Sequence, residues 1–140
     1  MASWRDSASA QAQNDLGGLL EPALGFAQQQ LAQRGEFFPY AVVVRTDGQT
    51  EMVSGRPDAG NDRPASIDVI AACRTTLAER RDRLRAAAIV ADVRLPGGGN
   101  ALQAELEHTE GPALTVQLPY TKKRFGRSIE YGQLSAGAGT

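Results

Sequence analysis

A side-chain alternation with a period of two, over residues 87–118, most constrains the fold of this chain of 140 residues. Neighbouring side chains of a β-strand point to opposite faces, so this period predicts strands with one buried face. Breaks rich in Gly and Pro, at 96–100 and 110–112, divide the alternation into three runs. The three runs therefore predict an antiparallel meander joined by short turns.

Helical spacing occurs twice before this meander. Asp15 or Asn14 can cap a first helix, and Gly35 fits the left-handed residue that would end it. Pro22 fits a first helical position, which allows a regular start at Glu21. The apolar stripe of this helix comprises Leu16, Leu19, Leu20, Ala23, Leu24, Ala27 and Leu31. A second helix follows Pro64, with a buried stripe of Ile67, Ile70, Cys73 or Arg74, Leu77 and Leu84.

A hairpin is predicted between the two helices. Residues 37–44 are apolar at nearly every position, which is typical of a central strand covered on both faces. Asp47-Gly48 predicts a type I′ turn, and the shorter, more polar run 50–54 suits an edge strand. Phe37 and Phe38 are expected to close the core under both helices.

These elements predict an α+β fold, with helices packed on a five-stranded antiparallel sheet and the element order α-β-β-α-β-β-β. The apolar first strand favours a central place, which gives the strand order 2-1-5-4-3. This order resembles the profilin-like or roadblock-like architecture, and the resemblance carries no function with it. Residues 15–134 are expected to form one domain, with disordered tails at 1–14 and 135–140.

Composition narrows the classes of partner. The net charge of −1 argues against nucleic acid or membrane as a global partner. The single cysteine, Cys73, makes no internal disulfide, and no metal-ligand set or cofactor motif is present. No leader sequence or apolar run long enough to span a membrane is apparent, so we expect a cytoplasmic protein without cofactor or metal.

Two stretches offer candidate binding residues. At the junction between the first helix and the first strand, Glu36 and the hydroxyl of Tyr40 have no structural reason for their chemistry, and Tyr120 ends the last strand. A buried Glu36 would need a partner, and a cation from 122–127 could supply it, although the predicted strand order does not favour that contact. Basic residues around an aromatic are typical of phosphate or single-stranded nucleic acid binding; here they are Lys122, Lys123, Arg124 and Arg127 around Phe125. A solvated connector, or a partner for the acidic strand of Glu105 and Glu107, is the favoured interpretation of this segment.

Other candidates have simpler interpretations. Glu105 and Glu107 point the same way on a strand, which could bind metal but is typical of a solvated face. His108, the only histidine, has no nucleophile beside it, so a hydrogen-bonded or half-exposed strand histidine is expected. Residues 97–99 are three glycines between strands, where loop geometry explains them better than phosphate binding does.

Three segments together resemble a small bacterial protein family of no known activity. They are Gly35-Glu36-Phe37-Phe38-Pro39-Tyr40, then 118–123 (LPYTKK), and Glu130-Tyr131-Gly132. The resemblance spans residues 16–134 and implies no reaction.

The sequence predicts a non-catalytic binding module, of an immunity-like or accessory regulatory kind, whose partner is another protein or a second copy. One alternative is a ligand sensor or enzyme with a site near Glu36, Tyr40 and Tyr120. Another is weak nucleic-acid binding through residues 122–127.

Overall fold

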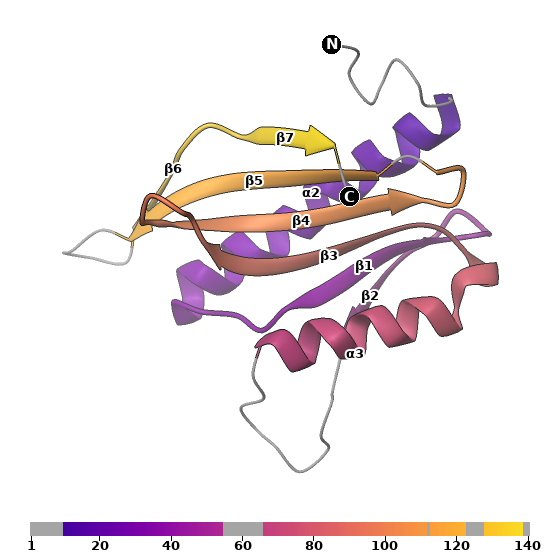
Figure 1. Ribbon diagram of the computed structural model, residues 1–140, viewed down its shortest axis with the longest axis horizontal. Helices are drawn as coiled ribbons and strands as arrows, with labels where there is room; N and C mark the ends of the chain where they lie inside the picture. Colours follow the sequence, from indigo (N-terminus) through magenta and orange to yellow (C-terminus); the bar gives the residue numbers. More distant parts are fainter. Residues whose placement is uncertain (1–9, 55–65, 112, 123–127, 139–140) are drawn as a thin grey trace.

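The computed structural model describes residues 10–54, 66–111, 113–122 and 128–138 (Figure 1). The elements in chain order are α2 (Ala10–Arg34), β1 (Tyr40–Arg45), β2 (Thr50–Ser54), α3 (Ser66–Glu79), the short 3-10 helix η1 (Arg81–Arg83), β3 (Leu84–Arg94), β4 (Asn100–His108), β5 (Ala113–Lys122), β6 (Ile129–Tyr131) and β7 (Ser135–Ala138). The predicted α+β class is confirmed.

The strands form one curled antiparallel sheet in the order β2-β1-β3-β4-β5, and β6 and β7 both pair with the outer edge of β5 (Figure 1). Within the described residues the sheet therefore has seven strands rather than the predicted five. The predicted order 2-1-5-4-3 is wrong, because β3 and not β5 pairs with β1. β3 is buried on both faces from residue 86 to residue 91, whereas β5 buries only alternate residues. The strand with two buried faces therefore takes the central place.

Helix α2 covers one face of this sheet. It is continuous through Pro22 and begins at Ala10, before the expected start at Glu21 or Asp15. Proline removes one backbone donor from a helix, and the buried side chains on both sides of it hold the two halves on the sheet. The core on this side joins Leu16, Leu19, Ala23, Leu24, Ala27 and Leu31 to inward side chains of β1, β3, β4 and β5.

Helix α3 lies on the opposite face and connects β2 to β3 across β1 (Figure 1). It packs on β1 and β3 through Val69 and Cys73, while Ile70 and Leu77 are partly buried. Ile67, predicted to be buried, is 76% exposed. The buried stripe therefore lies on Val69 and Cys73 instead of Ile67.

Glycines with a positive φ lie at the end of α2 and in the turn between β1 and β2. Gly35 ends α2 with a φ of 75°, as predicted, and its amide bonds the carbonyl of Leu31 at 2.9 Å. The β1–β2 hairpin is present, but its turn is not type I′, because Asp47 does not have a positive φ. The amide of Gly48 bonds the carbonyl of Arg45 and Gly48 has a φ of 89°, which makes a three-residue loop of the type I plus bulge kind.

Two further expectations change at the margins. Phe37 packs against the core as predicted. Phe38 is 47% exposed, so the prediction that it closes the core is wrong. Residues 10–14 belong to α2, and residues 135–138 form β7 along β5, where the sequence predicted disordered tails. The remaining residues of both predicted tails lie outside the described residues.

Candidate functional site

A groove runs between α3 and the strands on its side of the sheet. Two adjoining pockets form it, of about 200 Å³ and about 310 Å³. They share five lining residues: Arg74, Leu77, Ala87, Ile89 and Glu107. The floor is apolar, and both walls carry charge.

The helix wall comes from one side of α3 and its extension into η1. Arg74, Leu77, Ala78 and Arg81 line the larger pocket at a spacing of three and four residues. This spacing places side chains on one side of a helix. Two guanidinium groups, those of Arg74 and Arg81, therefore belong to the same wall.

The opposite wall comes from β4. Glu105 and Glu107 are two residues apart on this strand, paired to Ile89 and Ala87 of β3 respectively. Two residues apart on a strand share a face, so both carboxylates stand on the α3 side of the sheet. The shared face predicted for these two residues is thus observed. The cations of Arg74 in α3 and Arg81 in η1 line the groove on the other side.

Only one of the two acids is paired. Arg74 Nη2 lies 2.7 Å from Glu105 Oε2, with side chains 56% and 40% exposed. Within the described residues, no hydrogen bond or ion pair joins Arg81 or Glu107 to another side chain. An exposed ion pair contributes little stability, so Arg74 and Glu105 are available to a partner at small cost.

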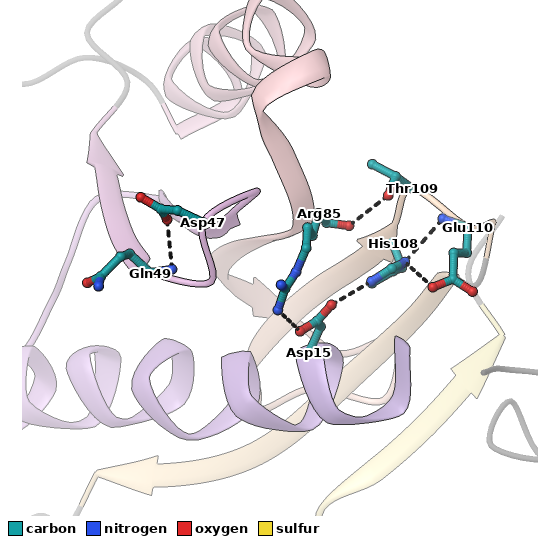
Figure 2. Close-up of polar contacts among 7 residues, drawn as sticks. All are labelled: Asp15, Asp47, Gln49, Arg85, His108, Thr109 and Glu110. Atoms are coloured by element: carbon teal, nitrogen blue, oxygen red, sulfur yellow. Dashed lines mark hydrogen bonds and ion pairs between the residues drawn. The ribbon is translucent and has the colours of Figure 1, made fainter. Parts of the chain in front are cut away.

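A buried polar cluster lies at the other face of the sheet, under α2 (Figure 2). Asp15 is 7% exposed, and each of its oxygens has a separate partner. Oδ1 accepts from Arg85 Nη2 at 2.6 Å, and Oδ2 faces His108 Nε2 at 2.8 Å. Asp15 was predicted as a helix cap, but it is the sixth residue of α2 and holds this cluster instead.

The second nitrogen of His108 is also engaged. Its Nδ1 accepts the backbone N–H of Glu110 at 3.1 Å, so the proton of the neutral ring is on Nε2 and is donated to Asp15. The Glu110 carboxylate lies 3.9 Å from the same Nδ1. His108 is therefore the hydrogen-bonded strand histidine that the sequence predicted, and as it stands neither nitrogen faces a nucleophile.

The carboxyl of Asp15 is held in its ionised form. Burial opposes ionisation, but the hydrogen bonds from His108 and Arg85 and the charge of Arg85 outweigh it and lower the pKa of Asp15 below 3.8. The aspartate and the Arg85 cation therefore form a partly buried ion pair that positions α2 on the sheet.

A β-bulge directs Arg85 into this cluster. Val44 pairs with Ala86 and Arg45 pairs with Leu84, so Arg85 is an extra residue in β3. Leu84 packs on the α3 side and Ala86 on the α2 side. The extra residue between them turns its side chain towards α2, which is how bulges commonly re-aim a side chain.

Both tyrosines of the predicted site are buried. Tyr40 is 3% exposed, and its hydroxyl donates to the carbonyl of Ala23 in α2. Tyr120 is 4% exposed and donates to Asp92 Oδ2 at 2.7 Å. Burial raises the pKa of both hydroxyls above 10.0, and for Tyr120 the bond to Asp92 and its charge add to the effect. Both hydroxyls thus bond within the fold, whereas Glu36 is exposed.

The basic segment does reach the helix–strand junction. Lys122 Nζ donates to the carbonyl of Gly35, at the carboxyl end of α2. A cation is favourable there because the helix dipole is negative at that end. The end of β5 and the start of β1 lie at the same end of the sheet, which the predicted strand order did not favour. Lys123, Arg124 and Arg127 lie outside the described residues.

Sequence reasoning missed the helix wall of the groove and the partners of Asp15. The first was hidden because the pattern offered Arg74 only as an alternative to Cys73 in the buried stripe, and because Arg81 lies in a run of charged residues at the end of the helix. The second did leave a signal, since Asp15 lies within the apolar stripe formed with Ala12, Leu16 and Leu19. An acid at a buried position requires partners.

The described residues contain no group of three or more His, Cys, Asp or Glu side chains placed to hold a metal ion. Of the helices described, none is both long and apolar enough to cross a membrane. No family model, no curated protein and no solved structure matches the chain.

Proposed function

We propose that this protein is a non-catalytic interaction module, and that its binding surface is the groove between α3 and β4. The observation that carries the proposal is the arrangement of charge: arginines on the helix wall, glutamates on the strand wall and an apolar floor between them. Binding sites of proteins combine such an apolar surface with a few placed polar groups.

The charged side chains on the two walls indicate which class of ligand the groove can bind. Arg81 presents a planar donor group suited to a carboxylate, and Glu107 presents an acceptor suited to a cation. A segment of protein offers acidic, basic and apolar side chains within one short length. A small anion or a nucleic acid would meet the repulsion of Glu105 and Glu107, so a protein segment fits better than either.

The buried polar cluster supports a structural rather than a chemical role for the one histidine. Asp15 and His108 form a pair that can take part in proton transfer in other settings, but here Nδ1 of His108 is bound by a backbone amide. The pair fastens α2 to the sheet, and Arg85 and His108 also line one part of the larger pocket of the groove.

The test is selection from a displayed library of random peptides against sparsely immobilised protein. We expect enriched peptides that bind the wild type, that lose at least tenfold in affinity against Arg81→Glu or Glu107→Arg, and that shift the amide resonances of Leu77 and Ile89. Arg94→Glu and Glu21→Arg, which reverse exposed charges elsewhere, should leave binding unchanged. Enriched peptides that bind all four variants equally would show that the groove is not the recognition surface.

A further inference from the structure

We infer that the partner at this groove is a second copy of the same chain, arranged about a two-fold axis parallel to α3. This inference rests on the function proposed above and names its partner. It depends on the incomplete helix layer, on the exposed face of α3 and on the unpaired charges of the groove.

The helix layer on the α3 side covers only part of the sheet. Strands lie roughly 4.8 Å apart, so a helix about 10 Å wide covers two of them. Helix α3 packs on β1 and β3 (Figure 1). On the same face of β4 and β5, Ala101 is buried, whereas six further side chains remain at least partly exposed: Gln103, Glu105, Glu107, Ala113, Thr115 and Gln117.

The bare strip has the dimensions of one further helix. Packed helices lie 8–10 Å apart, which would set a neighbour of α3 directly over β4 and β5. With 14 residues α3 is about 21 Å long, and the five positions 113–117 of β5 extend about 17 Å, so the strip accommodates most of the helix. Among the described elements, none occupies it.

The outer face of α3 suits contact with such a strip. Ile67 is 76% exposed at the start of the helix, and Ala71 is exposed one turn further along it. A small side chain lets a helix approach a sheet closely, and burial of an isoleucine stabilises the contact. In the dimer this face rests on β4 and β5 of the other copy.

A two-fold rotation about an axis parallel to α3 leaves the position of each residue along that axis unchanged. Arg81 and Glu107 line the same pocket, so they stand at one level. Arg81 of one copy therefore arrives beside Glu107 of the other, and the reverse contact forms by symmetry. An isologous interface of this kind pairs both unpaired charges at once. Two copies of the helix fill one layer between two sheets.

Sedimentation velocity over a wide dilution series tests the inference on the full chain. We expect the wild type to form a species of twice 14.9 kDa that dissociates on dilution. Arg81→Glu alone places two acids together at each contact, and Glu107→Arg alone places two cations together. Each variant should dissociate at concentrations at least tenfold higher than the wild type does.

An equimolar mixture of the two variants provides the decisive arm. In the mixed dimer, Glu at position 81 of one copy meets Arg at position 107 of the other, and the wild-type pair remains at the second contact. Association should return to near the wild-type level, which pairing within a single chain cannot produce. Each variant alone, at the same total concentration as the mixture, serves as the control and should show no recovery.

Three results would overturn the inference: a wild type that is monomeric at every concentration, variants that dimerise as well as the wild type, or a mixture without recovery. A monomeric protein that still selects groove-binding peptides would exclude the second copy while leaving the proposed function in place. Circular dichroism of each variant distinguishes lost association from lost fold.

Discussion

His108 and Asp15 lie 93 positions apart and meet through a hydrogen bond of 2.8 Å between Nε2 and Oδ2. This contact joins the last residue of β4 to α2, the first of the described helices. The hydrogen bond holds α2 on the sheet, so we expect the free energy of unfolding to depend on it.

Removal of the carboxylate tests this dependence. Asp15→Ala leaves Arg85 and the His108 N–H without their acceptor, and we expect a loss of about 3 kcal/mol in the free energy of unfolding. Denaturant titration measures it, with the exposed Glu21→Gln on the same helix as the control. In a double-mutant cycle, Asp15→Ala and His108→Ala should show a coupling of about 1–2 kcal/mol. Strictly additive losses would contradict the contact.

Acid should abolish the contribution of Asp15. The pKa of its carboxyl is lower in the folded protein than the ordinary 3.8, so folding favours the ionised form. The resulting stabilisation is complete above the ordinary value and disappears as the pH falls through the folded-state value. We expect the stability difference between the wild type and Asp15→Asn to be constant near neutral pH and to shrink below 3.8. A difference that already closes above that pH would oppose this account.

All three tyrosines should resist ionisation. Burial raises the pKa of Tyr40, Tyr120 and Tyr131 above 10.0, so folding favours the neutral phenol of each. In a spectrophotometric titration at pH 10, we expect much less phenolate in the folded protein than in the denatured chain. The corresponding stabilisation is present below that pH and is lost as the pH rises past it. Equal phenolate in both states would be inconsistent with the burial described.

Gly35 and Gly97 form a matched pair for backbone conformation. Gly35 has a φ of 75°, whereas Gly97 does not have a positive φ and has no atom within 4 Å of an added Cβ. Gly35→Ala should cost about 1 kcal/mol because alanine is strained in the left-handed region. Gly97→Ala should be neutral or slightly stabilising. Thermal unfolding compares the two, and equal midpoints would argue against a strained position at Gly35.

The local elements could be predicted from the sequence, whereas their neighbours in space could not. The meander follows from side-chain alternation and from turn residues such as Pro96, all within a short stretch of chain. The strand order depends on which strand β1 meets, and that choice is made by burial on both faces of β3. Phe38 shows a similar limit, because an aromatic near a core gives no sign of which side of the strand it takes.

Only half of the candidate site could be predicted from the sequence. Glu105 and Glu107 lie on one strand, and their shared face follows from the period of two. Arg74 and Arg81 come from another element, and their place opposite the acids depends on α3 crossing β1. The role of Arg85 depends on a bulge that shifts it by one place, which no side-chain pattern marks.

The connectivity has a consequence for the order of folding. Strands β3, β4 and β5 pair with their sequence neighbours, so forming them closes only short loops. Helix α2 precedes every described strand, yet the polar contacts of its Asp15 are to residues 70 and 93 positions away. We expect the meander to be structured in the folding transition state and α2 to dock after it. Kinetic φ-values near zero for Asp15 and well above zero for Val116 would agree, and the reverse pattern would refute this order.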